Sequence, residues 1–292
     1  AFSSADKVSG DDLVYSNTRA DFTFLKATPN PNVGTNRRVF VEGVSLSGAD
    51  SGNYNLVSAF AGTTASITPR AVTVSGLTVA DKVYDGSTAA TVNTAGAVYD
   101  GLVAGEVLST TATGTFASRN ASANAQMVTL AATTTAGANT LLSNYTVTEQ
   151  ASTSARITPK AVTVSGITAA DKTYDGSTSA TVNAAGAVYT GLVAGEALST
   201  TATGVFADKN ASDAPKTVAL TASTTAGDAT TLPSNYSVTE QTSATASIER
   251  KLLTITATAQ DKVYDGTVTA AVSSFALSGV LAGEQVSVAA GS

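Results

Sequence analysis

One short string, aspartate-lysine-x-tyrosine-aspartate-glycine, occurs three times in this chain and constrains its architecture more than any other feature. The strings begin at Asp81, Asp171 and Asp261, so the sequence repeats with a period of 90 residues. The repeats of a solenoid are shorter, about 20 to 50 residues each. A period of 90 residues has instead the size of a small independent domain. The spacing therefore predicts a row of separate domains rather than one continuous coil.

The period divides the chain into four repeats, of which two are complete. Proline separates strand-like segments in the strings ITPR and ITPK, and it cannot donate a hydrogen bond to a sheet. Asp12 in the first repeat aligns with Glu106 in the second, so the first contains only the closing part and the last only the opening part. We expect a segment of a longer array, with head-to-tail completion of the half-repeats by another molecule as the alternative. The predicted boundaries are repeat 1 at 1–69, repeat 2 at 70–159, repeat 3 at 160–249 and repeat 4 at 250–292.

Alternation of apolar and hydroxylated residues predicts β-strands almost throughout. Val72 and Val74 flank Thr73, and Tyr145 and Val147 flank Thr146. No segment shows a sustained helical period, so almost no helix is expected, with six to eight short strands in each complete repeat. The alanine-rich stretch 131–140 is predicted to be a hairpin or long loop. The fold class predicted is all-β, a rod-like tandem array of immunoglobulin-like β-sandwiches, with β-grasp-like units as the alternative.

The amino-acid composition excludes most kinds of catalytic site. The 292 residues include no cysteine, histidine or tryptophan, which are the residue types of many nucleophilic, metal and redox sites. The net charge of −6 offers no basic surface for nucleic acid. Charged residues are 13% of the chain, against about a quarter in average domains, which favours an extracellular location. We therefore expect no enzyme activity, no catalytic residue, no cofactor, no metal site and no membrane-spanning segment of about 20 apolar residues.

The tyrosine-aspartate-glycine part of the string is interpreted as a structural landmark. Asp-Gly is a favoured turn pair, because glycine accepts positive φ and aspartate bonds to its own backbone. The preceding tyrosine is expected to pack its ring over the turn. The landmark residues are Tyr84, Asp85 and Gly86; Tyr174, Asp175 and Gly176; and Tyr264, Asp265 and Gly266.

Two further side-chain sets could carry chemistry. Lys82, Glu106 and Asn144 are the residue types of an isopeptide cross-link, in which a neutral amine attacks an amide beside a protonated acid in a dry pocket. Asp81 and Asp85 could supply oxygen atoms to calcium, although their spacing matches no established calcium loop. The more ordinary interpretation of both sets is solvated side chains in loops.

Several strings together resemble known repeat families. They are the YDG string, the AGE turn, the FA-x-x-NA stretches at Phe116–Ala121 and Phe206–Ala211, the SNY turn and the closing ITPK. In these features the chain is similar to the YDG and MBG repeats of large bacterial surface proteins, notably filamentous-haemagglutinin-like adhesins exported by two-partner secretion. The resemblance implies a stalk or spacer and supplies no catalytic residue. Repeat 1 departs from the pattern with the loop ATPNPNVGTNRRV.

These observations favour a structural segment of a bacterial extracellular adhesin or surface filament, in which tandem β domains project or build a fibre. The alternative is an adhesion module that binds glycans or associates with like chains. The expected partners are neighbouring repeats, head-to-tail copies joined through the half-repeats, and glycans. The expected location is the extracellular bacterial surface.

Overall fold

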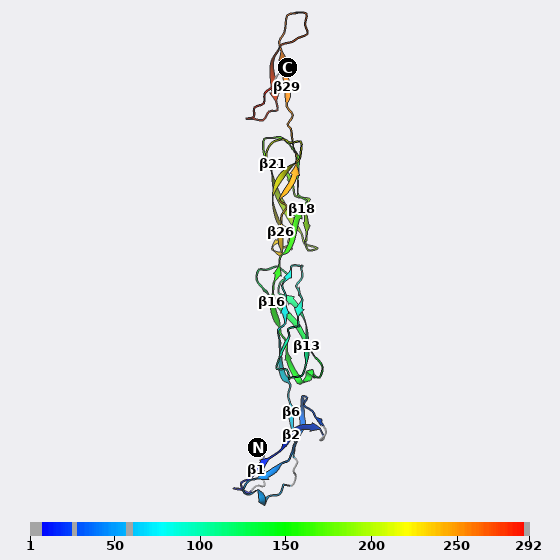
Figure 1. Cartoon of the computed structure of the whole chain (residues 1–292), viewed down its shortest axis with the longest axis vertical. Helices are drawn as coiled ribbons and strands as arrows, with labels where there is room; N and C mark the ends of the chain where they lie inside the picture. The colour runs from blue at the N-terminus through cyan, green and yellow to red at the C-terminus, as the bar shows by residue number, and fades with distance from the viewer. Residues whose placement is uncertain (1–7, 25–27, 57–60, 289–292) are drawn as a thin grey trace. The chain divides into compact units, whose positions relative to one another are not determined.

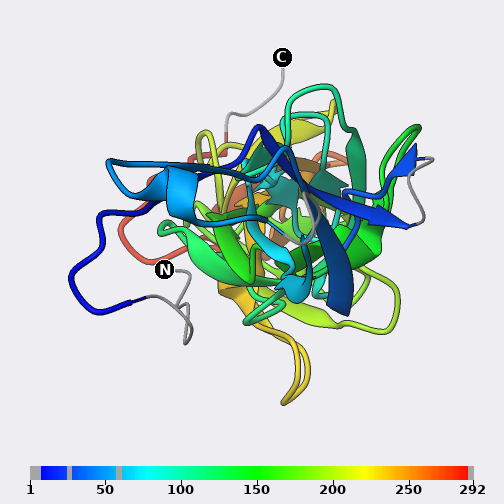
Figure 2. The same ribbon diagram turned by 90° about the horizontal axis from the view of Figure 1, so that it is seen from below.

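The computed structural model describes residues 8–24, 28–56 and 61–288. Strands joined by turns and loops make up this part of the chain (Figures 1 and 2). Its helical segments are three 3-10 turns, η1 (Ser51–Asn53), η2 (Leu142–Asn144) and η3 (Pro233–Asn235). The all-β prediction is confirmed. Within the described ranges, no helix has the length and apolar character needed to cross a membrane.

The chain divides into two compact units whose limits interrupt repeat 2. Unit 1 runs to Ala80 and also contains Thr88–Ala117 and Gln126–Ala155. Unit 2 contains Asp81–Ser87, Ser118–Ala125 and the chain from Arg156 onward. Three short segments of repeat 2, residues 81–87, 118–125 and 156–159, therefore belong to the same unit as repeat 3. The predicted repeat boundaries describe the sequence period and stay a prediction.

Repeat 3 lies wholly in unit 2 and forms a β-sandwich. In the smaller sheet β18 pairs antiparallel with β23 and parallel with β26, whereas the larger sheet is antiparallel in the order β21-β24-β25-β27 (Figure 1). The β-grasp alternative requires a helix across a sheet, and repeat 3 contains no α-helix. Its strands are β18 (Lys160–Ser165), β19 (Thr168–Ala169), β20 (Lys172–Thr173), β21 (Ser179–Ala180), β22 (Val182–Asn183), β23 (Val188–Thr190), β24 (Leu198–Phe206), β25 (Lys216–Ala226), β26 (Tyr236–Thr239), β27 (Ser243–Ala246) and β28 (Ile248–Glu249).

The core of repeat 3 lies between these two sheets. Along β24 the residues alternate, so that Leu198, Thr200 and Phe206 are buried while the serine and threonines between them are exposed. Val164 of the small sheet and Val218 of the large sheet belong to one buried cluster. A fully buried side chain of this size contributes about 1.5–3 kcal/mol. Gly204 is required by close packing, since a β-carbon there would lie 2.6 Å from the Val182 side chain.

Unit 1 repeats much of this architecture, and the two units each correct one prediction. In β14 (Gln126–Ala136) the stretch 131–136, expected to be loop, is strand paired with β13 (Leu108–Phe116). Three of its six residues are the β-branched threonines 133–135, which suit a sheet once the neighbouring strand supplies the pairing. Repeat 3 has eleven strands rather than six to eight, because several are two-residue pairs. The remaining strands outside repeats 3 and 4 are β1 (Val14–Ser16), β2 (Arg19–Phe24), β3 (Thr28–Pro29), β4 (Gly34–Glu42), β5 (Ser45–Ser47), β6 (Ala61–Ile67), β7 (Arg70–Ser75), β8 (Thr78–Val79), β9 (Lys82–Val83), β10 (Ala89–Ala90), β11 (Val92–Asn93), β12 (Val98–Asp100), β15 (Tyr145–Thr148), β16 (Ser152–Ala155) and β17 (Ile157–Thr158).

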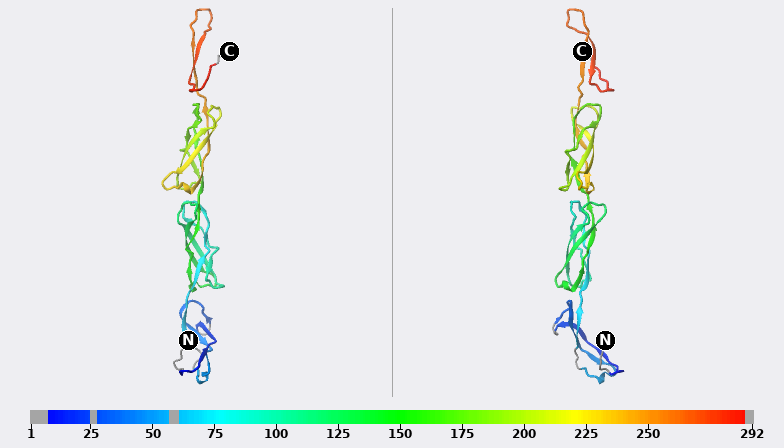
Figure 3. Two further views of the ribbon diagram at one scale, coloured as in Figure 1. Left: turned by 90° about the vertical axis from the view of Figure 1, so that its left-hand side faces the viewer. Right: turned by 180° about the vertical axis from the view of Figure 1, so that it is seen from behind.

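Repeat 4 is described to residue 288 and is much more open. It forms one antiparallel hairpin of β29 (Thr254–Ala259) and β30 (Val272–Ser278), drawn in orange to red in Figure 3. In repeat 3, β18 has strand partners on both edges, whereas β29 pairs only with β30 among the described residues. Large side chains such as Val263 and Tyr264 are 90% and 93% exposed.

Candidate functional site

The tyrosine-aspartate-glycine string forms a turn held by its own side chains. Asp85 Oδ1 accepts hydrogen bonds from the Ser87 backbone N–H and hydroxyl at 2.8 and 2.9 Å, and from Lys82 Nζ at 2.8 Å. Gly86 has φ 81°, a conformation that an L side chain rarely adopts. The same bonds recur around Asp175 and Asp265. Donation from Lys172 and Ser177 lowers the pKa of Asp175 to about 2.

Tyr84 contacts repeat 3. Its hydroxyl donates to Glu196 Oε1, and its ring meets the ring of Tyr236 edge-on, with centroids 5.5 Å apart. The side chain is 1% exposed. Gly86 lies at the same contact, where an added β-carbon would be 3.2 Å from Val193 Cγ1. The string therefore connects repeat 2 to repeat 3 within unit 2.

Glu196 receives hydrogen bonds from two tyrosines that belong to successive repeats. Its Oε1 accepts from Tyr84, and its Oε2 accepts from Tyr236 at 2.6 Å. The Tyr236 oxygen also accepts the Val193 N–H at 3.2 Å. Burial, together with the neighbouring carboxylate, raises the pKa of both tyrosines. These hydroxyls therefore stay protonated and can donate over a wide pH range.

Asn235 makes the second connection between repeats 2 and 3. Its Oδ1 accepts the Ala121 backbone N–H at 2.9 Å, and its Nδ2 donates to Asn120 Oδ1 at 3.2 Å. The asparagine is 1% exposed and ends the η3 turn directly before Tyr236. We call this set the repeat 2–repeat 3 junction; it consists of Tyr84, Asn120, Ala121, Glu196, Asn235 and Tyr236.

An equivalent asparagine connection joins repeats 1 and 2 within unit 1. Asn144 Oδ1 accepts the Val33 N–H at 2.9 Å, and Asn144 Nδ2 donates to Asn32 Oδ1 at 2.9 Å. Asn32 and Val33 lie in the divergent loop of repeat 1. They bind Asn144 in the way that Asn120 and Ala121 bind Asn235 at the repeat 2–repeat 3 junction. The carboxylate of the repeat 1–repeat 2 junction, Glu106, accepts from Tyr145 of its own repeat.

Repeat 1 also contains its own carboxylate–tyrosine pair, and it corrects an alignment. The Tyr54 hydroxyl donates to Asp11 Oδ2 and accepts the Val8 N–H at 3.1 Å. Tyr145 makes the same two bonds, with Glu106 and Val103. Asp11, rather than Asp12, therefore corresponds to Glu106. The alignment of repeat 1 with repeat 2 from sequence is shifted by one residue, because the flanking residues are too dissimilar to fix the register.

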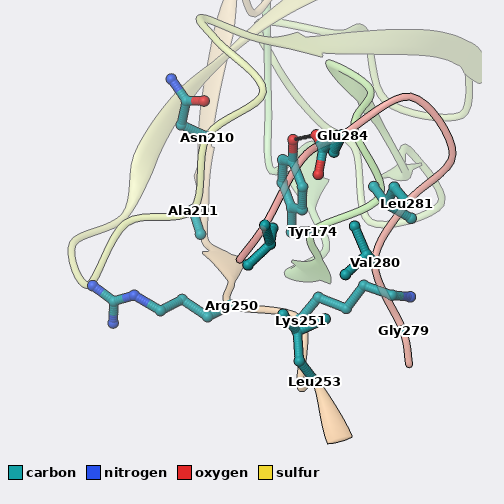
Figure 4. A pocket seen from close by; sticks show the side chains of 11 residues that line it. Tyr174, Asn210, Ala211, Arg250, Lys251, Leu253, Gly279, Val280, Leu281 and Glu284 are labelled. Atoms are coloured by element: carbon teal, nitrogen blue, oxygen red, sulfur yellow. Dashed lines mark hydrogen bonds between the residues drawn. The ribbon is translucent and has the colours of Figure 1, made fainter. Parts of the chain in front are cut away.

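The repeat 3–repeat 4 junction contains a tyrosine–carboxylate pair and a cleft beside it. Tyr174 donates to Glu284 Oε1, as Tyr84 does to Glu196, and Lys209 Nζ lies 3.9 Å from the same oxygen. Beside this pair is a cleft of about 250 Å³. Figure 4 shows Tyr174 and Glu284 joined across it, with Asn210 and Ala211 on a separate loop. Arg250, which replaces the junction proline, forms a bidentate ion pair with Asp213 at 2.6 and 3.1 Å.

The proposed cross-linking residues have other partners. Lys82 Nζ donates to Asp85 and Ser87 in unit 2, Glu106 accepts from Tyr145, and Asn144 binds the loop of repeat 1. Lys82 and the other two residues belong to different compact units. The structure does not bring the three together, and the cross-link stays a prediction without support from these contacts.

The carboxylates near the string accept hydrogen bonds from backbone N–H groups and from lysine. Asp81 Oδ1 accepts the Arg156 N–H at 2.7 Å, and Asp85 bonds within its turn. Among residues 8–24, 28–56 and 61–288, no three carboxylate, histidine or cysteine side chains are grouped so as to hold a metal ion. These aspartates have structural partners rather than a shared cation-binding geometry.

Sequence reasoning missed the role of the recurring glutamate and tyrosine. A signal was present, since the AGE glutamate, the SNY tyrosine and the YDG tyrosine recur together in the complete repeats. The YDG domain family profile matches residues 68–155, 158–245 and 249–292. No curated protein and no solved structure matches the chain significantly.

Proposed function

The chain belongs to the YDG domain family, and we propose that it is a structural stalk or spacer segment of a bacterial extracellular adhesin or surface filament. The observation that carries this proposal is Glu196, which holds one tyrosine from each of two successive repeats. Side-chain contacts of this kind supplement the covalent link Thr158-Pro159-Lys160 and restrict bending between repeats. Repetition of a stiff junction along the chain gives the stalk its length.

The composition supports a non-enzymatic role at the extracellular bacterial surface. The sequence has no cysteine or histidine, and the carboxylates of the junctions accept bonds from tyrosine hydroxyls. No nucleophile–base pair can be assembled from these groups. Protease treatment of intact cells that express the parent protein tests the location. Release of fragments containing repeat 3 supports it, and protection until the cells are lysed contradicts it.

Small-angle scattering of the 292-residue chain tests the spacer proposal. We expect an extended distance distribution for the unaltered chain. Glu196→Ala removes the acceptor of two tyrosines and should shorten the average length through increased bending. The matched control, Glu249→Ala, changes an exposed glutamate outside the junction and should leave the distribution unchanged. A compact envelope for the unaltered chain would overturn the proposal.

A glycan-binding module is the second candidate function. The cleft beside Tyr174 favours it, because an aromatic ring, the amide of Asn210 and the charged Glu284 line one cavity of about 250 Å³. A glycan array with the whole chain tests this candidate. Binding that is lost in Asn210→Ala supports it, and an array without signal rejects it.

A further inference from the structure

The first and last strands of repeat 3 each pair with another strand in parallel. The opening strand β18 runs beside β26 over four residue pairs, from Lys160↔Tyr236 to Thr163↔Thr239. The closing strand β28 pairs in parallel with β20 over two residue pairs. The other strand pairs within residues 160–249 are antiparallel. Parallel pairing in this repeat is therefore confined to the two strands at which the chain enters and leaves it.

The direction of these strands determines how a pull along the chain acts on the repeat. Tension enters repeat 3 at Lys160, the start of β18, and leaves at Glu249, the end of β28. Adjacent parallel strands begin at the same end of their ladder. Tension therefore pulls β18 toward its start and the segment from β26 to β28 toward its end. The paired strands are loaded along their length in opposite directions, so that all the bonds of a ladder share the load.

The closing strand is held by more than its two-residue ladder. The Lys172 N–H donates to the Ser247 carbonyl at 3.0 Å, and the Ser247 N–H donates to Asp171 Oδ1 at 2.5 Å. The Ile248 carbonyl accepts the Ser212 N–H at 3.0 Å. The Ile248 side chain is 0% exposed and belongs to the core cluster of the repeat. Tension at the exit of repeat 3 therefore has to break several hydrogen bonds and withdraw a buried isoleucine.

Repeat 2 has the same arrangement. Its opening strand β7 pairs in parallel with β15 over four residue pairs, and its closing strand β17 pairs in parallel with β9. The Lys82 N–H donates to the Arg156 carbonyl at 3.0 Å, and the Ser122 N–H donates to the Ile157 carbonyl at 2.9 Å. Ile157 is also 0% exposed. The parallel opening and closing strands are therefore a property of the repeat rather than of one copy.

We propose that these parallel ladders make each complete repeat resistant to force, so that the repeat stays folded while the chain is under tension. This goes beyond the spacer function, because a chain can be long without resisting a pull. The physical reason is kinetic, since forced unfolding is governed by the unfolding rate. A ladder loaded along its strands loses its bonds together, whereas a ladder opened from one end loses them one after another. The first process has the higher barrier under load.

Single-molecule force spectroscopy of the 292-residue chain tests the proposal through the direction of pulling. The chain has no cysteine, so a pair of introduced cysteines defines the two points of attachment. Ala161→Cys with Glu249→Cys loads both parallel ladders of repeat 3 along their strands. Ala161→Cys with Ser237→Cys attaches to one register pair at the start of the β18–β26 ladder and opens the ladder from that end. All three positions are exposed, so both variants are expected to fold.

The two pulling directions should give different unfolding forces for the same repeat. At equal pulling speed we expect the first pair to require about twofold to fourfold more force, because four register pairs share the load in one geometry and break in turn in the other. Unfolding between the first pair releases residues 161–249, at most about 320 Å of extended chain, which identifies the event. Equal forces in the two geometries, or a lower force for the first pair, overturn the proposal.

A pair of proline variants separates the parallel ladder from general stability. Ser237→Pro removes a backbone N–H from β26, and Val188→Pro removes one from β23, the antiparallel neighbour of β18. Both side chains are exposed. Both variants should unfold at lower urea concentration, but Ser237→Pro should lower the unfolding force between positions 161 and 249 more than Val188→Pro does. An equal loss of force in the two variants contradicts the role of the β18–β26 ladder.

Discussion

The YDG turns of repeats 2 and 4 have the same sequence and opposite surroundings. Both turns hold their aspartate by a lysine and by the hydroxylated residue two positions later. Tyr84 is nevertheless 1% exposed, and Tyr264 is 93% exposed. The turn itself is therefore a local structure that needs no neighbour. The burial of Tyr84 depends on a carboxylate and a second ring that repeat 3 supplies.

The largest expected effect separates these two tyrosines. Tyr84→Ala removes a fully buried ring and its bond to Glu196, and should lower the free energy of unfolding by about 3–5 kcal/mol. Tyr264→Ala, at an exposed position, should change it by less than about 0.5 kcal/mol. Urea unfolding followed by tyrosine fluorescence measures both variants. Equal effects would mean that Tyr84 does not stabilise the junction.

A smaller change tests the charge of the acceptor. Glu196→Gln keeps the shape of the side chain but leaves a neutral oxygen to accept from one tyrosine and places an NH2 donor opposite the other hydroxyl, and should destabilise unit 2 by about 1–2 kcal/mol. Glu249→Gln, which lies outside the junction, should have no measurable effect. Urea unfolding followed by tyrosine fluorescence measures the free energy of unfolding of both variants. A neutral result for Glu196→Gln would show that the ring contact and the Asn235 bonds hold repeats 2 and 3 together without the charge of Glu196.

Alkaline pH should weaken the repeat 2–repeat 3 junction. Burial and then Glu196 raise the pKa of Tyr84, so the folded protein holds this proton more tightly than the unfolded chain. The resulting stabilisation is complete below about pH 10, the ordinary tyrosine pKa, and decreases as pH rises through the folded-state pKa. Tyr84→Phe should make the alkaline loss of stability less steep. An unchanged pH slope in this variant would contradict the assignment.

The smallest expected effect concerns the turns in acid, where repeats 3 and 4 should behave alike. The Lys172 and Lys262 ammonium groups, with backbone and hydroxyl donors, lower the pKa of Asp175 to about 2 and also lower that of Asp265. The stabilisation is present above about pH 4 and is lost as pH falls toward 2. Carboxyl NMR titration of both residues measures this. An ordinary midpoint for Asp265 alone would mean that its turn requires burial.

Much of the fold could be predicted from side-chain periodicity. Val72 and Val74, placed on the apolar face by alternation, are 1% and 2% exposed. The stretch 131–136 was missed because alanine and threonine have no strong apolar signal, and pairing with β13 decides their state. The junction was missed because its members lie far apart in sequence. Tyr84 and Glu196 are separated by 112 residues, and no local pattern reports such a contact.

The sequence by itself determined the period, the strand alternation and the Asp-Gly turns, because the bonds that form such a turn join residues within five positions of one another. Only the tertiary structure decided that the tyrosine beside each turn is a link between repeats. Burial of Tyr84 requires Glu196 and Tyr236, which another repeat supplies.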